Sequence, residues 1–258
     1  YTKDNKNKPY NVISGINKYN NNHIPNSAYI DIQKHLSDIN SEFKFTILDL
    51  KKLAINFQKL GIGDPYEIIL YSRNGMQWAT RIWWMLKILG FKKVKILNGG
   101  YEEWLKLRLP LERKINKFKK ANFKYNFNKN EIVNKEYILN CISNKNVLLI
   151  NALTEDIFYG KNDRYGRPGT IPESINLPFN LFLTRNLNSF KLRNKIIKVI
   201  KNYNLIKNQE IVLFCGGGIA ATLNYFVLYH LGFKNLKLYD NSMSEWAANY
   251  YLPIQIKN

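Results

Sequence analysis

Cys215 is the residue whose surroundings in the sequence best suit chemistry. It follows the apolar run 211–214 and precedes three consecutive glycines and a segment with helical spacing. Glycines permit a tight turn in which successive N–H groups converge, and the start of a helix adds positive potential. Such a loop favours negative charge on sulfur, so we predict that Cys215 is a nucleophile. The loop residues predicted to hold the reacting group are Gly216, Gly217, Gly218, Ile219 and Ala220.

Other uses of a cysteine fit this sequence less well. A free cysteine is commonly a small buried hydrophobe, but a core cysteine needs no run of glycines after it. A phosphatase loop needs an arginine six residues after its cysteine, and position 221 is Ala. The glycine spacing also differs from that of nucleotide-binding loops. The second cysteine, Cys141, lies in a predicted helix at 135–142 and is interpreted as a packing residue.

The sequence predicts neither a metal site nor a cofactor. The three histidines, His23, His35 and His230, are scattered along the chain, and no second cysteine lies near Cys215. Metal sites in proteins need several such ligands at characteristic spacings, and the sequence offers no such spacing.

Short strands alternating with helices are expected to position Cys215. The elements predicted in the second half are, in order, 147–151, 194–203, 211–215, 220–231 and 236–240. This alternation predicts an α/β fold in which a parallel sheet carries helices on both faces. Ligands bind at the carboxyl ends of parallel strands, and Cys215 lies at such an end.

The chain also contains an internal repeat. The segment 89–98 (LGFKKVKILN) reappears as 231–240 (LGFKNLKLYD), and Trp104 reappears as Trp246, both at an offset of 142 residues. So long a period indicates a duplicated domain rather than a solenoid. We therefore predict a first domain at 1–112, a Lys/Asn-rich linker at 113–131 and a second domain at 132–258. In the first domain, strands are expected at 68–71 and 94–97 and a helix at 78–89.

Composition narrows the possible classes of protein. The 258 residues are 45% hydrophobic, which excludes disordered and collagen-like chains, and no apolar run approaches the roughly 20 residues of a membrane-spanning helix. Two cysteines are too few for a disulfide framework, and the start of the chain has no apolar signal core. We therefore expect a reducing compartment, the cytoplasm or the mitochondrial matrix. The first residue is Tyr1 rather than Met, so residues that precede it can be missing from this sequence.

The net charge of +20, from 39 Lys and Arg against 19 Asp and Glu, admits two interpretations. Clustered cations bind nucleic acid by displacing counterions from phosphates, which makes a nucleic-acid partner possible. The lysines are dispersed, however, and the abundance of Lys, Asn, Ile, Phe and Tyr is typical of genomes rich in A and T. The compositional interpretation is favoured by this dispersal.

These motifs together make the sequence similar to the tandem-domain rhodaneses, the family that includes thiosulfate and 3-mercaptopyruvate sulfurtransferases. The likeness runs from about Tyr10 onward. The segments that resemble the family are the Cys215 loop, 238–246 (LYDNSMSEW), 165–176 (YGRPGTIPESIN), 23–28 (HIPNSA), 31–38, 81–86 (RIWWML) and 97–100 (LNGG). The corresponding loop of the first half, 71–76 (YSRNGM), has no cysteine. The resemblance implies two tandem rhodanese-like domains, of which only the second is reactive.

The resemblance also implies the reaction. Cys215 would take a sulfane sulfur from a small donor such as thiosulfate or 3-mercaptopyruvate, become a persulfide, and pass the sulfur to a thiol, cyanide or a protein acceptor. The first domain would wall the cleft and supply side chains across the interface. Asp240 and Ser242 follow the last strand and are expected to line the same cleft, whereas Trp246 is interpreted as core.

Several positions depart from the pattern of the family. Gly216 and Gly217 stand where thiosulfate-type members carry cations, and Gly217 also replaces the serine of mercaptopyruvate-type members. Substrate-binding arginines are missing at Leu153 and Ile157. The remaining candidates for substrate binding are Arg164, Arg167 and His23. The arginines could instead be solvated loop charges, and the histidine a turn residue.

A second hypothesis follows from these departures. The chain could be a degenerate rhodanese that serves as a binding or structural subunit of a larger assembly, including one that contains RNA. The intact Cys215 loop favours the enzyme, since a loop freed from catalysis has little reason to keep a cysteine before three glycines at the start of a helix.

Overall fold

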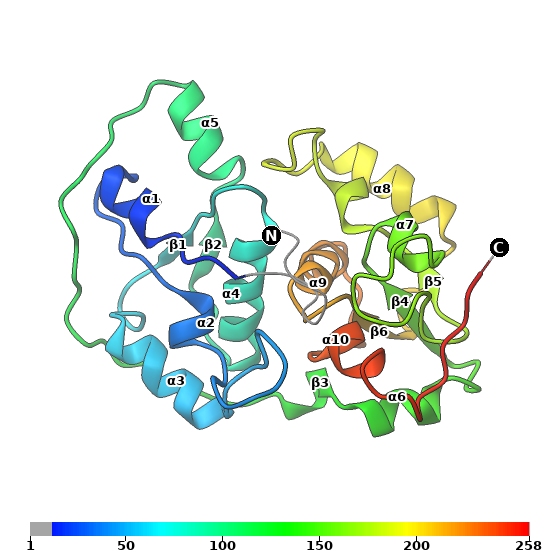
Figure 1. Cartoon of the computed structure of the whole chain (residues 1–258). Coiled ribbons are helices and arrows are strands. Elements are labelled where there is room, and N and C mark those ends of the chain that lie inside the picture. The colour runs from blue at the N-terminus through cyan, green and yellow to red at the C-terminus, as the bar shows by residue number, and fades with distance from the viewer. Residues whose placement is uncertain (1–11, 258) are drawn as a thin grey trace.

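The computed structural model describes residues 12–257, so Tyr10, where the likeness begins, lies outside the described residues. The described part forms two halves that lie side by side (Figure 1). The first half contains α1 (Ile16–Asn21), α2 (Ile32–His35), α3 (Leu50–Lys59), β1 (Ile68–Leu70), α4 (Gln77–Ile88), β2 (Val94–Ile96) and α5 (Gly100–Lys106). The second half begins with η1 (Lys129–Glu131), β3 (Ile132–Val133), α6 (Lys135–Cys141), β4 (Val147–Asn151), α7 (Glu155–Phe158) and β5 (Ile175–Asn176). It continues with η2 (Phe179–Phe182), α8 (Arg193–Asn202), β6 (Glu210–Phe214), α9 (Ala220–His230), β7 (Leu236–Tyr239) and α10 (Ser242–Trp246).

The sheet of the second half places Cys215 at the end of its central strand. Its five strands are parallel in the order β3-β7-β6-β4-β5. In β6 the four residues 211–214 are all buried, and because successive side chains point to opposite faces, both faces of the sheet are covered. Helix α9 packs on β6 and β7. The predicted α/β architecture is confirmed here, with element bounds that differ by at most one residue at each end.

The first half has a smaller sheet than the second. Its named strands, in the described residues, are β1 and β2, which pair in parallel with Ile68 opposite Val94. Elsewhere the chain makes isolated bridges, such as that between His23 and Glu112. Helix α4 packs against both strands. The two-domain fold is thus confirmed, with the larger sheet in the half that carries Cys215.

The segment between α5 and η1 runs around the outside of the first half and then below it to β3 (Figure 1). It contains no helix or strand within the described chain, but it is tied to the first half by the bridge between Asp64 and Asn122. Gln58 Nε2 also donates to the carbonyl of Phe123 at 3.1 Å. The domain boundaries at 112 and 132 stay predictions from the sequence.

Helices α4 and α9 form the centre of the interface between the halves. Most residues of α4 are buried, including Trp83, Trp84 and Met85, which is typical of a helix that is apolar all round. Trp83 packs edge-on against Phe226 of α9, with ring centroids 4.8 Å apart. One continuous cluster of buried residues therefore spans both halves.

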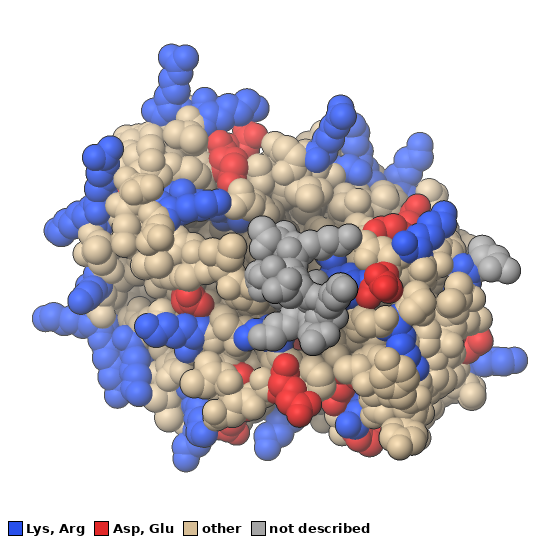
Figure 2. Space-filling view, viewed as in Figure 1, with Lys and Arg blue, Asp and Glu red and all other residues tan. Residues whose placement is uncertain are grey.

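Basic side chains are spread over both halves rather than gathered in one patch on the face seen in Figure 2. Acidic side chains lie among them on the same face. This distribution agrees with the compositional interpretation of the +20 charge. Within residues 12–257, no helix is long and apolar enough to cross a membrane, and no group of three or more His, Cys, Asp or Glu side chains is arranged to hold a metal ion.

Candidate active site

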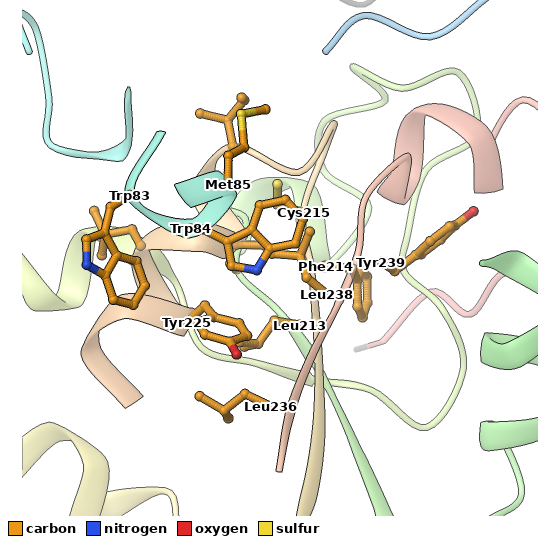
Figure 3. Close-up of a cluster of buried hydrophobic side chains, with 14 of the residues drawn as sticks. Trp83, Trp84, Met85, Leu213, Phe214, Cys215, Tyr225, Leu236, Leu238 and Tyr239 are labelled. Carbon is orange, nitrogen blue, oxygen red and sulfur yellow. The ribbon is translucent and has the colours of Figure 1, made fainter. Parts of the chain in front are cut away.

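Cys215 lies at the carboxyl end of β6, where the sheet meets the start of α9. Its side chain is 2% exposed and belongs to the apolar cluster that spans both halves. Figure 3 shows it beside Trp84 and Met85 of α4 and Phe214 of β6. The thiol is more deeply buried than an open cleft would leave it. In surroundings of such low polarity, hydrogen bonds to a charged sulfur are stronger than they would be in water.

The carbonyl groups of the Cys215 loop are held from outside. The carbonyl of Cys215 accepts the N–H of Met243 at 3.0 Å. That of Gly216 accepts from the N–H and the Oγ of Ser244, at 2.8 and 2.6 Å. That of Gly218 accepts from Arg81 Nη1 at 3.1 Å. The loop is therefore fixed by the beginning of α10 and by a side chain from the first half.

Unlike the carbonyl groups, the N–H groups of the loop are not hydrogen-bonded to the described part of the chain. In a trans peptide the N–H points away from the carbonyl of the preceding residue, so the N–H groups of Gly216, Gly217 and Ile219 point away from α10 and Arg81. Among the described residues, none of the N–H groups from position 216 to position 221 has a hydrogen-bond acceptor. The start of α9 also has no side-chain cap. A row of unpaired donors at the start of a helix can bind an anion.

Ser242 links the backbone of Cys215 to the end of β7 through two hydrogen bonds. Its Oγ accepts the N–H of Cys215 at 3.0 Å and donates to the carbonyl of Tyr239 at 2.7 Å. Ser242 has a positive φ of 53° and is fully buried. Ser242, a predicted neighbour of the cleft, thus holds the loop in place. Asp240 is buried beside Gly218, and Trp246 is buried as expected.

Tyr165 lies against the loop, which the sequence analysis did not anticipate. A Cβ added to Gly216 would overlap the Tyr165 hydroxyl and ring. Because Gly216 has no side chain, the Tyr165 ring can pack directly against the loop. No signal in the sequence pairs these two residues, because they come together only when the segment before β5 folds over β6.

Arg81 is the second residue that the sequence analysis did not assign to the site. Its side chain is completely buried in α4, and its guanidinium bonds to Asp240 as well as to the loop. A signal for it does exist: a charged residue in the middle of an apolar helix must find a partner in the interior. Arg81 therefore brings the first half into the site.

His23 lies within the first half and, among the described residues, makes no hydrogen bond, ion pair or ring contact with the Cys215 loop. Its ring is completely buried and stacks on Tyr19 at 3.9 Å between centroids. The two ring nitrogens bond to the carbonyls of Tyr19 and Lys114, at 2.8 and 3.0 Å. These contacts hold the turn in which His23 lies, and they occupy both nitrogens that a substrate would need.

The two arginines differ in their surroundings. Arg167 donates to the carbonyls of Ala247 and Leu252 at 2.9 Å. It also donates to those of Trp246 and Asn249, at 2.9 and 2.6 Å. It therefore anchors the C-terminal segment, which accounts for its charge without a substrate. Arg164 is exposed, and its guanidinium has no partner among the described residues.

The second thiol, Cys141, lies in surroundings that disfavour its thiolate form. It is 5% exposed, in α6. Burial is the main factor that raises the pKa of the Cys141 thiol, and the negative charge of Glu210 adds to it. Its interpretation as a packing residue agrees with this environment.

Two cavities lie where the halves meet. One, of about 610 Å³, is lined by Glu103, Lys106, Thr184, Arg185, Asn186 and Ser189. The other, of about 420 Å³, borders the carboxyl ends of β3 and β7 and includes Thr46, Asp240 and Asn241 in its lining. Neither of these two cavities is lined by Cys215, so the candidate site consists of the loop and the residues that contact it.

Comparison with known proteins agrees with this geometry. The model of the Rhodanese-like domain matches residues 13–107 and, separately, residues 136–249. The 3-mercaptopyruvate sulfurtransferase of Escherichia coli K12 is 29% identical over 241 residues, which cover 92% of this chain and 85% of the relative. The thiosulfate sulfurtransferase of Rattus norvegicus is 26% identical over 235 residues, covering 89% and 78%. The crystal structure of SseA from Escherichia coli, a 3-mercaptopyruvate sulfotransferase with the rhodanese fold, matches with a TM-score of 0.79 and 26% identity, covering 89% of this chain and 86% of that one.

Proposed function

We propose, on the premise that this chain belongs to the Rhodanese-like domain family and carries two copies of that domain, that it is a sulfurtransferase whose reaction passes through a persulfide on Cys215. The observation that carries the proposal is the row of N–H groups from position 216 to position 221, which have no acceptor among the described residues. These donors belong to the loop and helix start that follow Cys215. They suit a sulfur anion at this place.

The reaction divides into two displacements at sulfur. In the first, the Cys215 thiolate attacks the sulfane sulfur of the donor, forming an S–S bond while the donor's S–S or C–S bond breaks. Thiosulfate would leave as sulfite, and 3-mercaptopyruvate would leave as pyruvate after taking up a proton. In the second, the acceptor attacks the outer sulfur and the Cys215 thiolate leaves. The loop N–H groups can stabilise the negative sulfur in both steps.

The donor is a small anion in either case. A relative named 3-mercaptopyruvate sulfurtransferase and one named thiosulfate sulfurtransferase match the chain at similar sequence identity. The loop itself offers no cation, since positions 216 and 217 are glycines. We propose that the loop N–H groups bind the transferred sulfur, and that Arg164, whose guanidinium has no partner within residues 12–257, meets the anionic group of the donor at the surface.

Mass spectrometry of the intact chain tests the proposal. After incubation with thiosulfate, 3-mercaptopyruvate or a persulfide donor, wild type should gain the mass of one sulfur atom, and peptide mapping should assign it to Cys215. A Cys141→Ser variant should gain it equally, and Cys215→Ser should not. Added cyanide should remove the sulfur and yield thiocyanate. Absence of the gain with all three donors would contradict the proposal.

The same variants address the second hypothesis, a binding or structural subunit. A subunit of that kind would keep its cellular role when Cys215 is replaced by serine, whereas a sulfurtransferase would lose it. The unpaired loop donors favour the enzyme, because a structural loop would satisfy its N–H groups internally.

A further inference from the structure

Arg81 is a buried cation that the fold alone does not require. It is fully buried in α4, and burying a charge is costly unless partners compensate it. Its Nη1 lies 2.6 Å from Asp240 Oδ1 and 3.1 Å from the carbonyl of Gly218, and its Nη2 lies 2.7 Å from the carbonyl of Phe45. One guanidinium thus joins the Cys215 loop, the end of β7 and a loop of the first half.

The bond to Gly218 sets the direction of a loop donor. Gly218 has a φ of +70°, and its carbonyl is turned toward Arg81. Because the N–H of the following residue points the opposite way, this bond directs the N–H of Ile219 away from Arg81. Ile219 is the N-cap residue of α9, and its N–H has no acceptor within the described chain. Arg81 therefore controls the orientation of a donor at the start of the helix.

Asp240 holds the guanidinium in this position. Its Oδ1 pairs with Arg81, and its Oδ2 accepts the N–H of Ile47 at 2.6 Å. The carboxylate is therefore fixed by two groups of the first half. The charges of Arg81 and Asp240 offset each other, so the pair acts on the loop through geometry.

The duplication shows which contacts the interface itself needs. At the repeat offset of 142, Met76 corresponds to Gly218 and Leu187 to Phe45. In that corresponding place the N–H of Met76 donates directly to the carbonyl of Leu187 at 3.3 Å. The position that corresponds to Arg81 is Leu223. The interface thus closes without an arginine on the side that lacks the cysteine.

We propose that Arg81 is a positioning residue for sulfur transfer: the inactive domain inserts it to fix the Gly218 carbonyl and so aim the Ile219 N–H at a sulfur anion on Cys215. The inference rests on the proposed function for the reaction itself. The orientation of the loop can be measured independently, through the reactivity of Cys215 toward a simple alkylating reagent.

The test uses the full chain with the variants Arg81→Met, Arg81→Lys and the control Asn98→Ala. Asn98 corresponds to Asp240 in the repeat, and its Oδ1 accepts the N–H of Phe190 across the interface at 2.8 Å, away from the cysteine loop. Two rates are measured: alkylation of Cys215 by iodoacetamide, followed by peptide mass spectrometry, and persulfide formation from thiosulfate. Urea denaturation establishes conditions under which every variant is folded.

We expect Arg81→Met to lower both rates by about tenfold or more, the effect of losing one oriented donor to a developing anion, with the half-saturating concentration of thiosulfate changed by less than about twofold. Arg81→Lys, which keeps the charge but cannot reach all three acceptors, should recover part of the rate. Asn98→Ala should keep both rates within about twofold of wild type, since it removes an exposed interface bond only. A purely structural arginine would change the urea midpoint without changing the rates of the folded protein.

Three results would decide against one proposal or the other. A folded Arg81→Met chain that reacts at wild-type rates overturns the role of Arg81 and leaves the sulfurtransferase proposal intact. If wild type gains no sulfur but Arg81→Met still slows alkylation, the proposed function fails and the positioning role stands. If Arg81→Met does not fold, Arg81→Gln takes its place, and wild-type alkylation in that variant again overturns the role.

Discussion

The hydroxyl groups of Thr80 and Thr222 lie 3.1 Å apart across the interface of the two halves, and the residues are 142 positions apart in the sequence. This separation equals the offset of the internal repeat. Each threonine thus meets its own duplicate, as is required on the axis of an approximate two-fold symmetry. The backbone repeats as well: Phe45 and Leu187 share a positive φ of 68° and 61°.

The symmetry ends at the cysteine loop, where Gly218 occupies a place that only glycine tolerates. Its φ is +70°, and an added Cβ would lie 2.7 Å from both Arg81 Nη1 and Asp240 Oδ1. We expect Gly218→Ala to lower the free energy of unfolding by roughly 2 to 5 kcal/mol, from left-handed backbone strain and overpacking together. Urea denaturation measures this loss.

Gly166→Ala is the matched control for that variant. Gly166 also has a positive φ, of 105°, but an added Cβ would meet nothing within 4 Å. Its cost should be limited to backbone strain of about 1 to 2 kcal/mol. If the two variants lost equal amounts of unfolding free energy, the close contacts around Gly218 would contribute nothing to the cost of its substitution.

Gly216 and Tyr165 should be energetically coupled. Gly216→Ala forces the Tyr165 ring from the loop and should lower the free energy of unfolding by about 1 to 3 kcal/mol. Tyr165→Ala removes the obstacle, so the double variant should lose less than the sum of the single losses, with a coupling of about 0.5 to 3 kcal/mol. Strict additivity in the urea denaturation of the four proteins would contradict the contact.

Arg167 should matter for stability and not for transfer. Arg167→Met leaves up to four carbonyls of the C-terminal segment without their donor, and we expect a loss of roughly 2 to 4 kcal/mol. The rate of persulfide formation in the folded protein should not change. A normal urea midpoint combined with impaired transfer would restore the prediction that Arg167 binds the donor.

The exposed Arg164 provides the opposite case. Arg164→Met should change the free energy of unfolding by less than about 0.5 kcal/mol, as is usual at the surface. If it meets the donor, the half-saturating concentration of thiosulfate should rise by about two- to fivefold, the worth of an exposed ion pair. Steady-state kinetics at several salt concentrations check this, since added salt should reduce the effect.

His230 should make stability depend on pH. Its ring packs against Trp83 and Phe226, at 5.6 and 4.4 Å between centroids. This partial burial lowers the pKa of His230, and the charge of Arg193 lowers it further. A histidine whose folded pKa is lowered contributes stability above its unfolded pKa of about 6.5, and the contribution is lost as the pH falls below that value.

The His230→Gln variant isolates this contribution. Between pH 7 and pH 5 wild type should lose more stability than the variant, by a few tenths of a kcal/mol because solvent screens a ring at the surface. The comparison uses urea denaturation at matched ionic strength. Parallel pH profiles for the two proteins would contradict the expected sign of the pKa shift.

Local features of the sequence determined the fold class and the repeat, and they carry the prediction that Cys215 is the nucleophile. Strands, helices and their alternation depend on the spacing of apolar residues along the chain, and the loop after Cys215 depends on three adjacent glycines. The repeat offset of 142 identified α4 and α9 as equivalent helices before their packing was known. These are properties of neighbouring residues, or of two copies of one pattern.

Tertiary structure alone decided which side chains meet the loop. Arg81 and Tyr165 lie 137 and 51 positions from their loop contacts, Gly218 and Gly216. His23 and Arg167 bond instead to backbone carbonyls outside the loop, most of them also distant in the sequence. Charge and residue type do not distinguish an arginine that binds a substrate from one that binds carbonyls. That choice depends on which acceptors the packed interior leaves within reach, because a buried donor must be satisfied by whatever the fold brings to it.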